Sequence, residues 1–153
     1  MLAALILVAS LAMLMFYLQA LCDRVLRREF QQPYFKLIAR TNGLEFPAVR
    51  AALQEDGQGI TYEHLRLALA CDYRALTYLL RKVEAPRLLG SAFEENLLAN
   101  YCRLLFLTLG LRHFLGLQVK PAALKLAAVL QYFAGVVGQR VEVLRAGNLG
   151  AAA

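Results

Sequence analysis

The chain has 153 residues, with 17 basic and 11 acidic side chains and a hydrophobic fraction of 59%. This length allows one compact domain and a short additional segment. The apolar content exceeds the roughly 45–50% of ordinary soluble domains, which excludes a disordered chain. Three Cys without C-x-x-C spacing exclude a disulfide framework and a Cys-based zinc site. We therefore expect a membrane-associated protein with one small folded domain.

Residues 2–21 carry no charge, and only Ser10, Tyr17 and Gln19 interrupt the apolar run. At about 1.5 Å per residue, a helix of this length spans about 30 Å, the thickness of the hydrocarbon core of a bilayer. A buried helix of a small domain is rarely apolar on every side along its whole length. Residues 1–22 are therefore predicted to be a transmembrane anchor.

Removal of this segment after synthesis is the main alternative. A signal peptide has a basic region, a shorter apolar stretch and a small-x-small cleavage site, but no Lys or Arg precedes this apolar run. A lipoprotein would carry its lipid on Cys22, yet the bulky Leu21 stands where such a site needs a small residue. We expect the segment to remain in place as an anchor.

Basic residues follow the anchor, and none precedes it. Those within about twenty residues, the range over which the Lys/Arg bias sets orientation, are Arg24, Arg27, Arg28, Lys36 and Arg40. This bias predicts an extracytoplasmic N-terminus and a cytoplasmic domain on a single-pass protein of the cell membrane. Arg24, Arg27 and Arg28 are the candidate contacts to anionic lipid headgroups, at about 1 kcal/mol each near the surface.

The remainder of the chain is predicted to be helical, since no stretch alternates with a period of two. Residues 23–45 are expected to form a basic juxtamembrane helix and connector. The first helix should continue to about Phe30, and Pro33 should start or kink its continuation. The sequence Thr41-Asn42-Gly43 is typical of a helix end.

A helical domain of about four helices is expected over residues 46–147. Pro47 in a first turn predicts a short helix that ends near Asp56. Thr61 is the expected cap of a second helix, which reaches about Val83. Its predicted apolar stripe is Leu65, Leu69, Leu76, Leu80 and Val83, opposite a polar face with Glu63, Arg66, Arg74 and Arg81.

Two longer helices complete the predicted domain. The sequence Ser91-Ala92-Phe93-Glu94 is a capping box, and the helix it opens is expected to reach Leu115. Lys120-Pro121 begins the last helix and Gly147 is its expected end, with a loose tail over 148–153. Apolar residues spaced by three and four predict a packing face, used within the bundle or by a partner. They are Leu126, Leu130, Phe133, Val137 and Val141.

Residues 104–111 and 122–138 are more apolar than a freely soluble bundle requires. Neither is a comfortable membrane span, because Arg103 and Arg112 bracket the first and Lys125 interrupts the second. A core hairpin between the two long helices is the simplest interpretation. A surface docked on the membrane or on a partner subunit, and additional spans, are the alternatives.

Residues 56–63 approach the pattern of a calcium-binding EF-hand loop but do not complete it. Such a loop opens with a carboxylate ligand and closes with a bidentate Glu. With Asp56 as the second ligand, Gln54 falls at the first position and Glu63 arrives one residue early. An interhelical turn is the expected structure.

The two histidines, His64 and His113, have no carboxylate or Cys at the spacing that would complete a metal or haem site. Cys71 lies seven residues from His64, two helical turns away, too far for the pair to act as a nucleophile and its base. Cys102, inside an apolar helix, is expected to be a packing residue. The sequence thus predicts no catalytic residue, no metal and no cofactor.

Asp72 projects from the apolar stripe of its helix, seven residues after Leu65 and four before Leu76. A carboxylate at such a position must be paired, or its desolvation costs several kcal/mol. Arg103 or Arg112 on the neighbouring helix is the expected partner. The alternative is a role at a partner interface.

The net charge of +6 also requires a test for nucleic-acid binding. A DNA-reading helix would concentrate Lys, Arg and polar side chains on one face. Arg66, Arg74 and Arg81 are sparse and offset by Glu63 and Asp72, which argues against nucleic acid as a partner. Membrane lipids explain the charge more simply.

These patterns predict an all-α protein with a single N-terminal transmembrane helix and a small cytoplasmic bundle. The favoured function is that of a non-catalytic, membrane-anchored accessory or scaffold subunit of a larger membrane protein complex. The alternative is a free-standing membrane-tethered adaptor or regulator that recruits a soluble partner.

Overall fold

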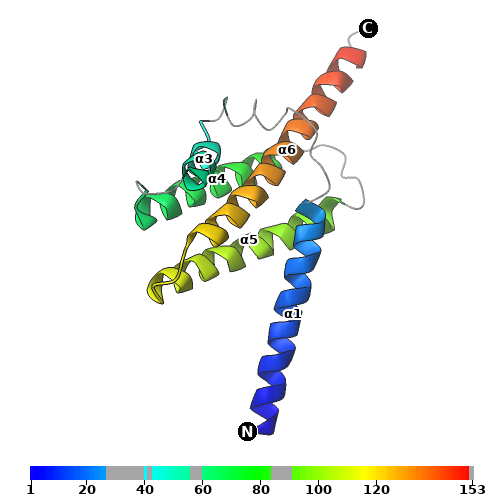
Figure 1. Ribbon diagram of the computed structural model, residues 1–153. Coiled ribbons are helices and arrows are strands. Elements are labelled where there is room, and N and C mark those ends of the chain that lie inside the picture. The colour runs from blue at the N-terminus through cyan, green and yellow to red at the C-terminus, as the bar shows by residue number, and fades with distance from the viewer. Residues whose placement is uncertain (27–39, 41–42, 56–59, 84–90, 152–153) are drawn as a thin grey trace.

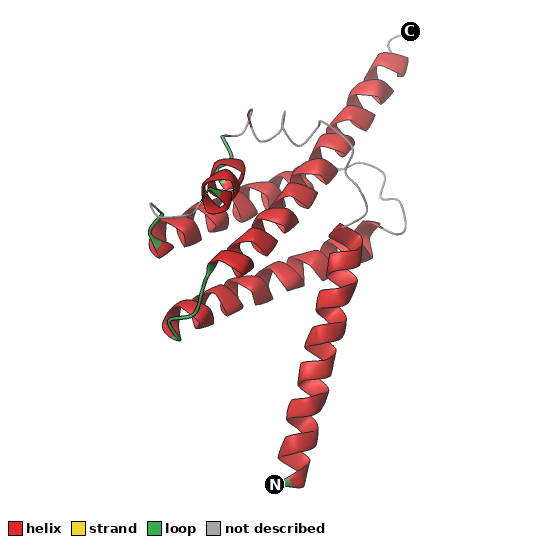
Figure 2. Cartoon of the chain, in the orientation of Figure 1, coloured by secondary structure: helices red, strands yellow, loops and turns green. Residues whose placement is uncertain are grey.

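The computed structural model describes residues 1–26, 40, 43–55, 60–83 and 91–151. Within these ranges the chain is all helical, as Figures 1 and 2 show. The helices are α1 (Leu2–Leu26), α3 (Phe46–Gln54), α4 (Tyr62–Lys82), α5 (Ser91–Phe114) and α6 (Lys120–Ala151). The prediction of an all-α chain is confirmed for the described residues. The predicted roles of Phe30 and Pro33 fall outside them.

Helix starts follow the sequence signals closely. Pro47 lies in the first turn of α3, and Thr61 occupies the N-cap position of α4 with an extended backbone. The Thr61 side chain makes no capping hydrogen bond, so its contribution is the backbone conformation. α5 begins at Ser91, within the predicted capping box. Gly43 has a φ of 61°, the left-handed conformation expected where a helix ends.

The turn between α5 and α6 depends on Gly116, whose φ of 65° is costly for any residue with a Cβ. Leu117 N donates to the Arg112 carbonyl at 2.8 Å, and Gly116 N donates to the His113 carbonyl at 3.1 Å. This pair of hydrogen bonds is the Schellman arrangement, which satisfies the last carbonyl groups of a helix. It ends α5 and redirects the chain into α6.

The predicted end of the last helix at Gly147 is wrong, because α6 continues to Ala151. A Gly in a helix interior costs only about 1 kcal/mol relative to Ala. Gly147 does not adopt a positive φ, and the residues on either side of it are helical. Residues 148–151 are therefore part of α6 and not of a loose tail.

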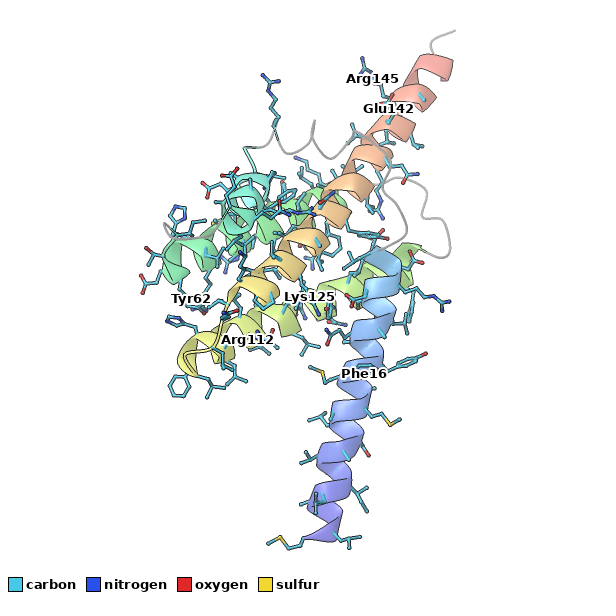
Figure 3. All side chains as sticks on the ribbon, viewed as in Figure 1. Phe16, Tyr62, Arg112, Lys125, Glu142 and Arg145 are labelled. Carbon is cyan, nitrogen blue, oxygen red and sulfur yellow. The ribbon has the colours of Figure 1, made fainter. Side chains whose placement is uncertain are left out.

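The core of the bundle forms around α6, which packs against α1, α3, α4 and α5. Four members of the predicted packing face are buried inside the bundle: Leu126, Leu130, Phe133 and Val137. Val141, the fifth, is 42% exposed, and Figure 3 shows the adjacent Glu142 on the part of α6 that extends beyond the other helices. The stripe is thus used mainly within the chain.

Hydrogen bonds and an ion pair between side chains connect α6 to neighbouring helices at two positions along its length. Arg50 on α3 donates a hydrogen bond to the side-chain oxygen of Gln131. Further along α6, Arg140 forms an ion pair with Glu95 on α5 and donates to the Leu80 carbonyl of α4 at 3.1 Å. The ion pair is largely buried, with side-chain exposures of 12% and 17%.

Asp72 on α4 is buried, but its partner is not the predicted arginine. The Phe46 backbone N–H, at the start of α3, donates to Asp72 Oδ2 at 2.6 Å. Arg103 is exposed to solvent, and Arg112 lines a different part of the bundle. Glu45, the N-cap residue of α3, makes no side-chain capping bond. Asp72 therefore caps α3 from a neighbouring helix and satisfies a backbone donor that would otherwise be unpaired.

Replacing Asp72 by Ala is expected to lower the free energy of unfolding by about 1–2 kcal/mol. The substitution leaves the Phe46 N–H without an acceptor. Asn at this position retains an acceptor oxygen, and we expect it to cost less than Ala. Urea denaturation in detergent, followed by circular dichroism at 222 nm, measures both variants. Equal losses for Ala and Asn would contradict a capping role.

The wild type and the Asp72→Asn variant also test the ionisation of the Asp72 carboxyl. Burial raises the pKa of Asp72 above its usual value, although hydrogen bonds from the Glu45 and Phe46 backbones oppose the shift. The folded state then holds the proton more tightly than the unfolded state, where the pKa is about 3.9. The free energy of unfolding of the wild type should therefore fall, relative to that of Asp72→Asn, as the pH rises above the unfolded-state pKa. A constant difference between pH 4 and 7 would contradict the shift.

Candidate membrane-facing site

α1 is long and apolar enough to cross a membrane, and almost all of its apolar window lies outside the bundle. Figure 1 shows it leaving the other helices at a steep angle, with the N-terminus at the far end. Only its C-terminal part packs on the rest of the chain, through the buried Cys22 and Val25 and the partly buried Leu18 and Leu26. The apolar side chains before this point face outwards in every direction, as the sticks in Figure 3 show.

α6 also has the length and composition of a membrane span, but two-thirds of its apolar window, 67%, is buried in the bundle. Its apolarity is thus explained by its position as the central helix of the core. For residues 122–138, the structure agrees with the predicted core hairpin.

α5 is divided between core and surface. Leu105 and Leu109 are buried, whereas Leu107 and Leu111 are 69% and 58% exposed. Leu115, one turn beyond Leu111, is exposed as well. One face of residues 104–111 therefore belongs to the predicted core hairpin, and the other is exposed; docking on a membrane or a partner subunit stays a prediction.

Among the predicted lipid-contacting residues, Arg24 is described and exposed near the C-terminal end of α1. Arg27 and Arg28 lie outside the described residues. Arg24 also lies in the last turn of α1, where a cation is favoured by the helix dipole. Its position at the junction of α1 and the bundle is compatible with a headgroup contact.

A cleft of about 180 Å³ lies where α1, α5 and α6 meet. α1 contributes Met15, Leu18 and Gln19 to its wall, and the other two helices contribute two cations, Arg112 and Lys125. Figure 3 shows these two residues on adjacent helices, α5 and α6. None of the described residues that line the cleft is acidic.

The cations of the cleft have donor capacity to spare. Arg112 Nη1 donates to the Gln118 carbonyl at 3.0 Å, which occupies one of the five N–H donors of a guanidinium. Lys125 is half-buried and makes no hydrogen bond or ion pair with another described residue. Two positive charges without an acidic neighbour in the lining make the cleft attractive to an anion.

Tyr101 lines the same cleft, and its hydroxyl is buried without a hydrogen-bond partner among the described residues. Burial raises the pKa of Tyr101 to about 12, and the Asp23 carboxylate adds to this effect. The hydroxyl therefore stays protonated at neutral pH and offers one unused donor. Leaving such a group unpaired costs on the order of 1–3 kcal/mol.

Elsewhere in the described part of the chain, the histidines and cysteines do not lie together in one site. The His113 ring stacks on Tyr62, with ring centroids 3.7 Å apart and an interplanar angle of 4°. His64 and Cys71 are exposed. Cys102 is buried, and desolvation raises the pKa of its thiol to about 12, so little thiolate forms. No group of three His, Cys, Asp or Glu side chains in the described part of the chain could hold a metal ion.

The cleft could not be identified from the sequence, where Arg112 and Lys125 stand out only as charges that interrupt two apolar stretches. Their proximity depends on the turn at Gly116, which returns α6 alongside α5. Comparison with protein-family models, curated proteins and solved structures found no match.

Proposed function

We propose that this chain is a non-catalytic accessory or scaffold subunit of a larger membrane protein complex. α1 would cross the membrane with its N-terminus outside, and the bundle would lie at the cytoplasmic face. The observation that carries the proposal is the exposure of the apolar side chains of α1 beyond its junction with the bundle. Water is an unfavourable environment for so large an apolar surface, whereas lipid is not.

The surface of the bundle supports a role in assembly. Large apolar side chains are exposed on α4 and at the start of α5, among them Leu67, Tyr78 and Phe93. Aromatic residues of this kind are enriched in protein interfaces. Exposed apolar residues on two helices are suited to contact with a partner subunit.

The side chains that could take part in catalysis make separate contacts within the bundle, which supports a non-catalytic role. The Asp72 carboxylate accepts a hydrogen bond from the backbone at the start of α3, and the His113 ring is stacked on Tyr62. General acid–base or nucleophilic catalysis needs such groups within hydrogen-bond reach of each other or of a common reacting atom. The arrangement is more suited to holding helices together than to chemistry.

A second candidate function is that of a membrane-tethered adaptor which recruits a soluble partner. The observation in its favour is the internal use of the α6 stripe, because Leu126, Leu130 and Phe133 are buried within the chain itself. A bundle that closes its own core does not require a partner in order to fold. The two candidates differ in the partners that should accompany the protein in the membrane.

Purification of the tagged full-length chain from its own membranes in a mild detergent tests the proposal. We expect elution at a mass well above that of the monomer, with integral-membrane partners in stoichiometric amounts. A matched variant carries Leu7→Arg and Leu11→Arg, two exposed positions of α1. Each Arg costs about 2.5–3.5 kcal/mol near the centre of a spanning helix, so this variant should leave the membrane fraction after alkaline extraction.

The control is a chain with Leu7→Ile and Leu11→Ile, which should remain in the membrane. Elution as a monomer or small homo-oligomer without integral-membrane partners would contradict the accessory-subunit function and favour the adaptor. An Arg variant that stays as firmly membrane-bound as the wild type would contradict the anchor itself.

A further inference from the structure

We propose that the cleft between α1, α5 and α6 binds the phosphate group of one anionic phospholipid, whose acyl chains lie between α1 and the exposed face of α5. This inference rests on the proposed membrane anchorage by α1 and deepens it. It assigns a defined lipid site to Arg112 and Lys125, both of which line the cleft.

The position of the cleft along α1 fits the level of lipid phosphates. Gln19 lines the cleft, and at about 1.5 Å per residue it lies about 26 Å along the helix from Leu2. The hydrocarbon core of a bilayer is about 30 Å thick. If α1 crosses the membrane, the polar wall of the cleft therefore lies close to the boundary between acyl chains and headgroups in the leaflet nearer the bundle.

The chemistry of the cleft fits a phosphodiester better than a neutral group. Arg112 has free guanidinium donors after its bond to the Gln118 carbonyl, and Lys125 has no partner among the described residues. The cleft has a volume of about 180 Å³. This space accommodates a headgroup phosphate, and the acyl chains must lie outside it.

An apolar path leads out of the cleft in the direction that acyl chains require. Leu104 lines the cleft, and the exposed Leu107 and Leu111 follow it on one face of α5 at helical spacing. The exposed Leu115 comes directly after the end of the helix. Across from them, Met15 lines the cleft from α1, in which Ser10 is the one polar residue between Met15 and Leu2. Figure 1 shows α1 and α5 diverging from their junction, so the apolar side chains of both helices are exposed beyond the cleft.

The test is native mass spectrometry of the full-length chain in detergent, titrated with phosphatidylglycerol and, separately, with phosphatidylcholine. We expect one phosphatidylglycerol to bind in preference to phosphatidylcholine. The double variant Arg112→Gln and Lys125→Gln should bind phosphatidylglycerol about thirtyfold more weakly, which corresponds to about 1 kcal/mol for each lost cation. Lys125→Gln alone, at a side chain without partners, should weaken binding about fivefold and leave the fold unchanged.

The matched control is Arg66→Gln with Arg74→Gln, which removes the same charge from an exposed face of α4 and should bind like the wild type. Equal binding by the cleft variant, or an equal loss in the control, would overturn the assignment. Displacement of the lipid by millimolar inorganic phosphate would also overturn it and indicate a soluble anion. Alkaline extraction of the cleft variant separates the two proposals, because membrane anchorage by α1 should persist when lipid binding is lost.

Discussion

Replacing Phe133 by Ala is expected to lower the free energy of unfolding by about 3–5 kcal/mol. Phe133 is 2% exposed and lies at the centre of the bundle, with aromatic contacts to Tyr73 on α4 and to Tyr132. Truncation removes the ring from a close-packed interior and leaves a cavity among helices that relax only partially. Urea denaturation in detergent, monitored at 222 nm, measures the loss.

Val141→Ala is the matched control, because Val141 belongs to the same predicted stripe but is 42% exposed. We expect this substitution to change stability by no more than about 0.5 kcal/mol. A similar loss at both positions would mean that the stripe of α6 is covered along its whole length by another molecule. A negligible loss at Phe133 would contradict the observed core.

Replacing Arg140 by Met is expected to cost about 3 kcal/mol of stability. The substitution keeps the apolar stem but leaves Glu95 as a largely buried carboxylate without its partner, and the Leu80 carbonyl without its donor. Since Arg140 joins α4, α5 and α6 at one point, the loss should affect the whole bundle in a single transition. Urea denaturation measured by circular dichroism and by tyrosine fluorescence would show coincident midpoints.

The double variant Arg140→Met and Glu95→Met provides the internal control. A buried ion pair replaced by apolar groups of similar volume is often neutral, whereas a single deletion leaves an uncompensated charge. We expect the second substitution to restore at least about half of the lost stability, which a double-mutant cycle would quantify. Additive losses would show that the two charges do not stabilise each other.

Much of the helical architecture could be predicted from local signals. Pro47 and Thr61 mark helix starts through backbone preferences that act within one turn. The spacing of the α6 stripe predicts that Leu126 and Leu130 share a packing face, because a period near 3.6 residues places them on one side of the helix; their burial within the chain comes from the structure. The end of α6 was missed because an exposed Gly147 costs a helix little, and no local signal requires it to stop.

The partner of Asp72 could not be predicted for a different reason. Sequence patterns indicate which side chains carry opposite charge, and Arg103 and Arg112 were the available cations. The observed partner is the Phe46 backbone N–H, and every residue except proline offers such a donor. Only the packing of α3 against α4 selects this one.

The cleft was equally hidden, because its parts are distant in the sequence. Gln19, Arg112 and Lys125 come from three helices, and nothing in the pattern of any one helix indicates that the other two are near. The left-handed conformation of Gly116 and the angle at which α1 leaves the bundle bring them together. A site of this kind becomes visible only with the tertiary structure.

The central place of α6 has a consequence for the order of events during synthesis. Translation delivers α1 before the helices of the bundle, and α3, α4 and α5 before α6. Domains generally form as units while the chain emerges, but here the faces of α3, α4 and α5 that pack on α6 have no cover until it leaves the ribosome. If α1 crosses a membrane as proposed, its insertion would precede closure of the bundle, and the apolar faces of α3, α4 and α5 would be temporarily uncovered beside the bilayer.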